Sequence, residues 1–498
     1  MSLIKVPIPW KGMDTTSEPD SLTSGQGTLV HNLLPGRTGQ LVPRGPLGVT
    51  SVVPNTAFDD AFHGGGGFWI SPSGSTYLQQ VGAASNVSAG GGAPFAIPGG
   101  GVYIGPSYAQ MDTYTVGITG SISTTPALYT WDGVTTMVKL TNGPINIVAV
   151  ASHLDRVFAL SATTLFWTDS KPNLPGNTAA MWQDDVTGLT NQIPLPSGEV
   201  YREVVEYNRV LYIIGDHSVY ALLGDTPTTF ALRKVLELGI ADGTGYSNSG
   251  HAEASNRGLY FWSYNGLVRF DGVNATVVSR DVQSILAVGA SQWHRITAIH
   301  DEYISVITQG RWLLYHEPTG AWSSLSSTTF HESAVHLGVS GLPTFVRPTQ
   351  TPGLGASWTA FSAGANSTST LGVRAGVQFN PDYAHVTGNW LDGFTDSINA
   401  QAISACIRLT SADRGAAIRR LHAEAGAGGW SVQVEDEAGV SIGQPAVVVA
   451  GPMRARAESS LFGENDIVRV RWTWDGQGAD RLSSIGDAYI EADTAQQR

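Results

Sequence analysis

The chain has 498 residues, of which 59 are glycine and 25 are proline, and only 14% are charged. Glycine usually makes up about 7% of a globular protein and charged residues about 25%, so this chain has an excess of turn formers and a shortage of charge. Its 14 Trp, 16 Tyr and 15 Phe supply ample core material and exclude a disordered chain. The scarcity of helix formers excludes a helical bundle or coiled coil, so the composition predicts an all-β protein.

The formal net charge of −13 excludes a protein that binds nucleic acid by neutralising phosphates. Cys406 is the single cysteine, so no disulfide can form within the chain. Residues 1–15 lack the apolar core of a secretory signal, and no apolar run is long enough to span a bilayer. We therefore expect a protein made in a cytoplasm, without membrane insertion of its own.

Residues 1–50 are polar and contain scattered prolines, which prevent long regular elements. We expect an extended N-terminal arm that adds a strand to a neighbouring subunit. Glycine-rich patches follow at residues 64–67, 90–92 and 99–101. Neither a lysine nor a helix start accompanies them, as a phosphate-binding loop would require, so they predict turning loops.

One pattern recurs between about residue 60 and residue 330: a short apolar strand, a polar turn and a second apolar strand. The paired segments are 68–70 with 76–78, 113–116 with 128–131, 157–160 with 165–167, 211–214 with 219–222, 259–262 with 267–270, and 303–306 with 312–315. They are β-branched and aromatic and are bounded by Gly, Asp, Ser or Asn, which is typical of hairpins. Their spacing of roughly 45 residues is that of propeller blades.

We therefore predict a β-propeller of six or seven blades over residues 51–348. Near-continuous apolarity within the strands fits sheets that are covered on both faces, as stacked blades are. A β-sandwich or a β-helix is the alternative, but a sandwich rarely keeps a constant spacing and a β-helix repeats at a shorter one.

Residues 349–370 are rich in Thr, Ser, Gly and Ala and predict a linker. A C-terminal β-sandwich is expected over residues 371–498. In residues 467–474, apolar side chains at 468, 470, 472 and 474 alternate with polar ones, which predicts a strand with one buried face. Residues 430–434 predict a second strand, and the mixed segment 416–425 is also interpreted as a strand.

Several histidines and carboxylates are of the residue types that bind metals or act in catalysis. His331, Glu332 and His336 resemble a zinc-protease helix, but the histidines are five residues apart where that motif needs four, so they would not face one metal. His294 and His300 lie in a strand-like run and are not expected to be ligands.

The segment Glu317–Trp322 is interpreted as a structural turn, and a group of aspartates is assigned to hairpin turns, where Asp bonds its own backbone. These are Asp60, Asp112, Asp132, Asp225 and Asp271. Nucleophile-elbow, phosphate-loop and Cys-x-x-Cys motifs do not occur. We expect no catalytic, cofactor-binding or metal-binding residues, and no enzyme.

Three stretches carry a resemblance to a known family. They are Asn32–Pro35 with Gly39–Gly45, Gly258–Gly272 with Val278–Val282, and Glu302–Trp322, the last ending in a Thr-Gly-Ala-Trp turn. They resemble the β-propeller tail proteins of bacteriophages, including the tail nozzle or stabilisation proteins of short-tailed phages. The C-terminal strands resemble the β-sandwich that often follows in that family, whereas the glycine-rich residues 64–101 depart from its compact blade.

The resemblance implies a structural virion protein located in the tail. Several copies, commonly six, would form a homo-oligomeric ring at the nozzle or connector that contacts neighbouring tail or adaptor proteins. During genome ejection the ring would touch exiting DNA transiently and without sequence-specific binding. Carboxylates facing the lumen would repel the phosphates and let the DNA slide.

A carbohydrate-binding or glycan-cleaving propeller, used in host-surface recognition, is the alternative function. Exposed Trp and Tyr side chains converging at the mouth of the propeller beside a pair of carboxylates would favour it. An intracellular scaffold with an unidentified partner is a third possibility.

Overall fold

The computed structural model places the following residues well enough to be described: 2–19, 21–37, 39–43, 48–49, 58–64, 67–72, 77–81, 95–96, 108–111, 114–119, 127–131, 138–139, 143–169, 182, 191–241, 252–286, 295–299, 302–308, 311–325, 335–337, 343–346, 375–378, 400–409, 416–425, 430–448, 455–465, 467–474 and 485–493. Within these residues the protein is all-β, as the composition predicts. The described helical segments are a single 3-10 turn, Arg280–Val282, and the adjoining short helix α1 (Gln283–Leu286).

Seven antiparallel sets of four strands, called sheets 1 to 7 here, follow one another along the chain. Sheet 1 is β6 (Phe58–Gly64), β7 (Gly67–Pro72), β8 (Tyr77–Val81) and β9 (Phe95–Ala96); sheet 2 is β10 (Tyr108–Met111), β11 (Tyr114–Thr119), β12 (Ala127–Trp131) and β13 (Val138–Lys139); sheet 3 is β14 (Ile147–His153), β15 (Arg156–Ser161), β16 (Thr164–Trp167) and β17 (Gln192–Pro194); sheet 4 is β18 (Tyr201–Tyr207), β19 (Val210–Gly215), β20 (Val219–Leu223) and β21 (Ala231–Leu236); sheet 5 is β22 (Ala252–Ser255), β23 (Gly258–Ser263), β24 (Gly266–Phe270) and β25 (Ala275–Val277); sheet 6 is β26 (Arg295–Ile299), β27 (Tyr303–Thr308), β28 (Arg311–His316) and β29 (Ala321–Leu325); and sheet 7 is β30 (Val335–Leu337), β31 (Pro343–Val346), β32 (Ala375–Gln378) and β5 (Gly48–Val49).

The six hairpins predicted from the sequence are confirmed. Each corresponds to the paired second and third strands of one of sheets 1 to 6. Sheet 7 was not predicted, because β5 and β32 come from opposite sides of the repeat region. Residues 375–378, which the sequence analysis assigned to the C-terminal part, pair instead with β31 and β5.

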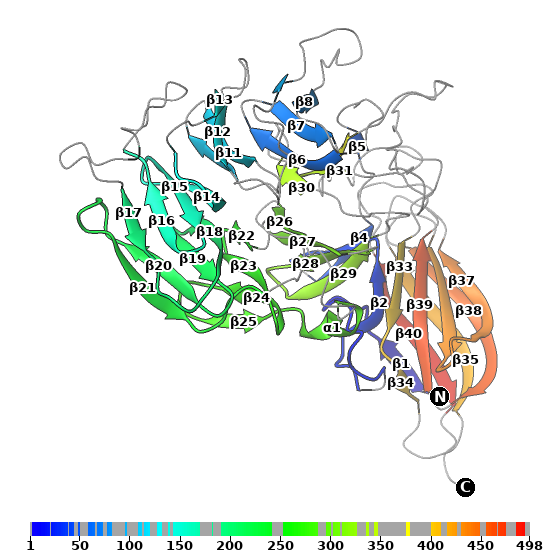
Figure 1. The fold of residues 1–498 in the computed structure, drawn as a ribbon. Coiled ribbons are helices and arrows are strands. Elements are labelled where there is room, and N and C mark those ends of the chain that lie inside the picture. Colours follow the sequence, from blue (N-terminus) through cyan, green and yellow to red (C-terminus); the bar gives the residue numbers. More distant parts are fainter. Residues whose placement is uncertain are drawn as a thin grey trace, which may run out of the picture.

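The sheets are arranged side by side with their first strands toward the middle of the view in Figure 1. From sheet 2 onward, the first strand of each sheet contacts the first strand of the next, and β30 of sheet 7 contacts β6 of sheet 1. Burial agrees with this packing: nearly every residue of β15, β19 and β23 is buried. The predicted covering of these strands on both faces is therefore confirmed for sheets 3 to 5.

Two further groups of strands lie at the other end of the molecule (Figure 1). One sheet has the order β1-β40-β35-β38, where β1 is Ser2–Val6, β40 is Ile485–Asp493, β35 is Ala416–Ala425 and β38 is Ala455–Asn465. The other group is β33 (Ala400–Ser404), β39 (Ile467–Trp474), β36 (Trp430–Asp436) and β37 (Ser441–Val448), with β34 (Ile407–Arg408) beside β39. The three strands predicted here are thus confirmed as β35, β36 and β39, and β39 alternates in burial at every residue.

Strand β2 (Gly27–His31) joins this second group to sheet 6. It pairs in parallel with β29 through His31 and Ser324, and antiparallel with β33 on its other side. The result is one 10-stranded sheet that runs from β26 to β37. A single hydrophobic core, which includes Leu313 and Trp322 of sheet 6 and Trp430 and Trp472 of the C-terminal strands, lies along it.

The N-terminal arm forms strands within the fold. β1 pairs with β40, β2 with β29 and β33, and β3 (Leu33–Pro35) forms a hairpin with β4 (Leu41–Pro43). The described arm strands thus pair within their own chain, and the hypothesis that the arm adds a strand to a neighbouring subunit stays a prediction for the outer edges of β1 and of the β3–β4 hairpin. The predicted linker 349–370 lies outside the described residues, and the domain boundaries remain predictions.

A tight turn in sheet 4 allows a test of this geometry. Asn208 and Arg209 connect the paired residues Tyr207 and Val210, and both have a positive φ, 51° and 61°. A glycine tolerates this conformation without steric cost, so Arg209→Gly is expected to raise the free energy of unfolding by about 0.5–1 kcal/mol. Urea unfolding of the variant measures it.

Arg257→Gly is the matched control, because Arg257 occupies the same place in sheet 5 without a positive φ. It should lower stability or leave it unchanged. A loss of stability in Arg209→Gly would contradict the turn geometry.

Candidate functional site

Buried and partly buried polar groups connect neighbouring sheets. His153 at the end of β14 is 2.8 Å through Nδ1 from Oε2 of Glu206 on β18. Glu317, in the turn between β28 and β29, accepts hydrogen bonds from Tyr260 (2.6 Å) and Ser255 (2.7 Å) of sheet 5. Burial, followed by this contact with Glu317, raises the pKa of the Tyr260 hydroxyl. These groups are enclosed between sheets, so their role is to hold the sheets together.

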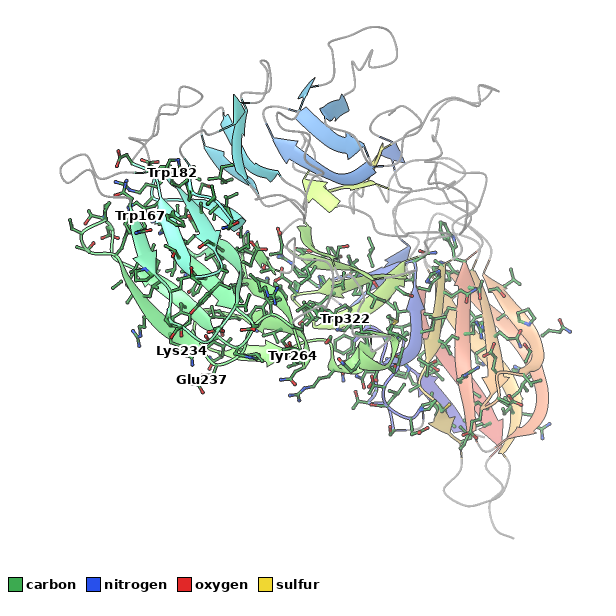
Figure 2. All side chains as sticks on the ribbon, viewed as in Figure 1. Trp167, Trp182, Lys234, Glu237, Tyr264 and Trp322 are labelled. Carbon is green, nitrogen blue, oxygen red and sulfur yellow. The ribbon has the colours of Figure 1, made fainter. Side chains whose placement is uncertain are left out.

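The segment Glu317–Trp322 has the structural role that the sequence indicated. Gly320 has a φ of 74°, and the indole nitrogen of Trp322 donates a 2.8 Å hydrogen bond to the carbonyl of Val278 beyond sheet 5. Figure 2 shows Trp322 near the middle of the molecule, beside the N-terminal arm. The predicted position of Asp271 in a turn is also confirmed, because its Oδ1 accepts hydrogen bonds from the backbone N–H groups of Val273 and Asn274.

The other histidines and carboxylates singled out in the sequence lie outside the described residues or in separate parts of the fold. Asp112, Asp132, His294, His300, His331 and Glu332 lie outside the described residues. Asp60 and His336 lie in β6 and β30, in different sheets, and Asp225 lies after β20. The described residues contain no group of three or more His, Cys, Asp or Glu side chains placed to hold a metal ion. In the same part of the chain, no helix has the length and apolarity needed to cross a membrane.

The N-terminal arm crosses sheets 5 and 6 at a group of polar and aromatic residues that range from buried to exposed. The backbone N–H of Met13 donates to the carbonyl of Trp322 (2.9 Å), and that of Thr15 donates to the carbonyl of Asp281 (2.7 Å). The hydroxyls of Thr15 and Ser284 are 2.8 Å apart, which fixes the arm against the helical turn after sheet 5. We call this region the arm surface; it comprises Trp10, Lys11, Asp14, Thr15, Thr16, Tyr264, Asp281 and Ser284.

Two carboxylates lie close together on the arm surface. Asp14 is 5% exposed, and its Oδ1 accepts hydrogen bonds from the backbone N–H groups of Thr16 (2.9 Å) and Ser17 (3.0 Å). Burial, and then the negative charge of Asp14, raise the pKa of Asp281 above its usual value. No described residue donates a hydrogen bond to the Asp281 carboxyl group. It is therefore an acceptor that a ligand hydroxyl could use.

Two exposed aromatic side chains accompany the carboxylates. Tyr264, in the turn between β23 and β24, is 61% exposed, and Figure 2 shows it at the lower margin of the molecule. The same turn contains Gly266, with a φ of 112°, where an added Cβ would clash with Ser279 and lie 2.9 Å from Oε1 of Gln283. This close approach places the Tyr264 turn directly beside the helical turn that bears Asp281.

Trp10 is the second exposed aromatic residue of the arm surface. It is 36% exposed, and the ammonium group of Lys11 lies 5.4 Å from the centre of its ring. Gly25 and Gly39, both with positive φ, pack against the indole, and an added Cβ at Gly25 would lie 2.7 Å from its nitrogen. These glycines leave room for the indole at the surface, where its outer part contacts solvent.

The sequence analysis missed this site, because its residues come from three separate segments. A local signal exists at Tyr264, an aromatic residue in a hairpin turn where polar residues are usual. The Trp10–Lys11 pair within a proline-rich arm is a second signal. The pair Asp14 and Asp281 has no local signal, since only the fold brings the two together.

Comparisons with known proteins find only distant likenesses. No protein-family model matches the chain, and no curated protein matches it. Among solved structures, an exo-β-1,3-galactanase from Phanerochaete chrysosporium with bound β-1,3-galactotriose is 11% identical over 78% of this chain and 96% of its own, with a TM-score of 0.26. Apo AztD from Citrobacter koseri is 13% identical over 54% of this chain and 73% of its own, with a TM-score of 0.32.

The extracellular domain of the one component system BT4673 from B. thetaiotaomicron is 11% identical over 95% of this chain and 63% of its own, with a TM-score of 0.39. At such identities and TM-scores, these likenesses carry no argument about activity or ligand.

The comparisons nevertheless correct one expectation. The chain was predicted to be a virion protein of a bacteriophage tail, with a part in genome ejection. The solved structures named above are a galactanase, AztD and the extracellular domain of a one component system, and none of them is a virion protein. The description as a phage virion protein is therefore corrected, whereas the expected location in a tail stays untested. The expected ring of copies around exiting DNA depended on that assignment and stays untested.

The raised pKa of Asp281 leads to a prediction. Above that pKa the folded protein holds a carboxylate that is less well solvated than in the unfolded chain, so the charge opposes folding. Asp281→Asn should therefore raise the melting temperature at pH 7, and the gain should shrink as pH falls through the raised pKa and be lost below the usual aspartate pKa of about 3.9. Thermal unfolding of both proteins between pH 3 and pH 8 measures the difference.

Asp271→Asn is the matched control, an aspartate in a turn of the neighbouring sheet. Backbone hydrogen bonds from Asn274 and Val273 lower its pKa, so its charge favours folding and its removal should lower the melting temperature at pH 7. If both variants change the melting temperature at pH 7 in the same direction, the environment assigned to Asp281 is refuted.

Proposed function

We propose that the protein is a carbohydrate-binding β-propeller with a C-terminal β-sandwich, and that it binds its ligand at the arm surface without cleaving it. Sheets 1 to 7 would be the blades. Support comes from the contacts between successive first strands, including that of β30 with β6. Completion of the last blade by β5 would close the ring, since the open edge of a sheet is otherwise exposed. The two sheets around Trp430 and Trp472 would be the sandwich.

The observation that carries the proposed function is the carboxyl group of Asp281, which accepts no hydrogen bond from a described residue and lies on the helical turn beside the exposed Tyr264 turn. A sugar has an apolar C–H face, which packs on an aromatic ring, and a rim of hydroxyl groups, which donate to carboxylates. Asp281 would accept from a ligand hydroxyl, and the exposed side chains of Tyr264 and of Trp10 on the arm would offer aromatic faces. The sequence analysis connected a glycan ligand with exposed Trp and Tyr at the mouth of the propeller, whereas these two residues lie where the arm crosses.

Nucleic acid is a poorer ligand for this surface than a sugar. The net charge of −13 opposes a phosphate backbone, and the two aspartates would repel it locally. Binding without cleavage is proposed because Asp14 is fixed by the backbone N–H groups of Thr16 and Ser17, as in an Asx turn. Asp14 is buried and holds the loop, which leaves Asp281 as the carboxyl group that would contact the ligand.

The proposal is tested by binding to a printed panel of neutral and acidic oligosaccharides that includes β-1,3-galactotriose, followed by calorimetry with those retained. The protein is expected to bind at least one of them. Trp10→Ala and Tyr264→Ala should each weaken binding about ten-fold, since loss of an aromatic contact costs roughly 1.4 kcal/mol.

Val273→Ala is the matched control. Val273 is 79% exposed in another turn of sheet 5, away from the Tyr264 turn, and its truncation should leave binding unchanged. Retention of no oligosaccharide, or equal losses in Val273→Ala and Tyr264→Ala, would overturn the proposed function.

A further inference from the structure

The tip of the β3–β4 hairpin supports Trp10. Its turn is closed by hydrogen bonds from the N–H of Gly36 to the carbonyl of Gln40 (2.8 Å) and from the N–H of Gly39 to the carbonyl of Gly36 (3.0 Å). A Cβ built on Gly39 would lie 3.6 to 3.7 Å from three atoms of the Trp10 indole. The backbone of Gly39 thus passes beside the ring with space for about one methyl group between them, so movement of this turn would change the surroundings of the indole.

Two contacts hold the tip of this hairpin to sheet 6. The hydroxyl of Tyr303 donates a 2.9 Å hydrogen bond to the carbonyl of Pro35, and the guanidinium of Arg37 forms an ion pair with Glu302. Leu33 and Leu41, at the base of the hairpin, are fully buried and hold it independently. Arg37 is 62% exposed, and an ion pair of this exposure contributes too little to decide global stability. The ion pair between Arg37 and Glu302 can therefore affect the position of the β3–β4 turn without deciding the stability of the whole fold.

We propose that Arg37 and Glu302 are positioning residues for Trp10: their ion pair holds the Gly36–Gln40 turn beneath the indole and so keeps the aromatic surface in place for a sugar. The inference rests on the proposed function in one respect, that Trp10 contacts the ligand. The positioning of the indole is a property of the free protein and can be measured without a ligand.

The neighbourhood of Glu302 also makes this positioning sensitive to acid. Nε2 of the fully buried His316 lies 3.9 Å from the other carboxylate oxygen of Glu302. Its Nδ1 is 2.7 Å from the hydroxyl of Thr319, and its ring centre is 4.8 Å from that of Tyr303. Burial, with the charges of Arg257 and Arg37, lowers the pKa of His316 to about 4. His316 is therefore neutral near pH 7, and its protonation in acid would add a second cation that competes with Arg37 for Glu302.

The experiment uses the full chain labelled with 5-fluorotryptophan. The fluorine resonance that disappears in Trp10→Phe identifies Trp10, and the remaining tryptophan resonances serve as internal references. Arg37→Ala and Glu302→Gln should each shift or broaden the Trp10 resonance at pH 7. Oligosaccharide affinity should fall roughly three- to five-fold in both, a smaller loss than in Trp10→Ala, since the pair acts through the indole. The reversed pair Arg37→Glu/Glu302→Arg should restore resonance and affinity.

Lys234→Ala is the matched control. Lys234 and Glu237 form another exposed ion pair, 3.2 Å apart, at the edge of sheet 4, and Figure 2 shows both on the far side of Tyr264 from Trp322. This variant should change neither readout. In acid the Trp10 resonance should move in the wild type and move less in His316→Phe, which keeps a ring against Tyr303 but does not titrate.

An unchanged Trp10 resonance in both Arg37→Ala and Glu302→Gln would overturn the inference, as would failure of the reversed pair to restore it. If the wild type binds no oligosaccharide, the proposed function fails, while the resonance still decides whether the pair positions the indole.

Discussion

The pairing of β2 on both of its edges is the constraint on which the rest of the structure depends. Gly27–His31 lies between β29 of sheet 6 and β33 of the C-terminal group, so the two parts of the molecule share one continuous sheet. One side-chain contact and one backbone hydrogen bond strengthen this junction: Nδ1 of His31 lies 2.9 Å from the hydroxyl of Ser324, and the backbone N–H of Asn32 donates to the Ser324 carbonyl. Hinge motion at this junction would break backbone hydrogen bonds and expose the common core.

The same pairing creates the arm surface. Residues leading into β2 are drawn across sheets 5 and 6, which brings Asp14 to Asp281 and presents Trp10 beside the β3–β4 hairpin. Two aspartates separated by most of the chain thereby come to share one environment. The contrast with Asp271 is instructive, because that residue is stabilised as a carboxylate by the backbone of its own turn.

Local patterns predicted what depends on local contacts. The hairpins of sheets 1 to 6 could be found because each joins apolar segments close in sequence, and β39 because its burial alternates residue by residue. The partners of β1, β2 and β5 could not be predicted, since no periodicity shows which distant edge a short strand will join. The candidate site was missed for the same reason: Trp10 and Tyr264 each have a local signal, but their common surface exists only after the arm has docked.

The pairing of the chain's first strands with its last also determines the order in which the molecule can be completed during synthesis. Sheets 2 to 5 draw their strands from neighbouring segments and can assemble while the ribosome is still translating. β5 waits for residues 375–378, and β1 waits for β40, the last strand. Contacts of such long range form late and slowly. A nascent chain must therefore keep Ser2–Val6 unpaired until Ile485–Asp493 has been made, which makes this strand a natural point for a chaperone to protect.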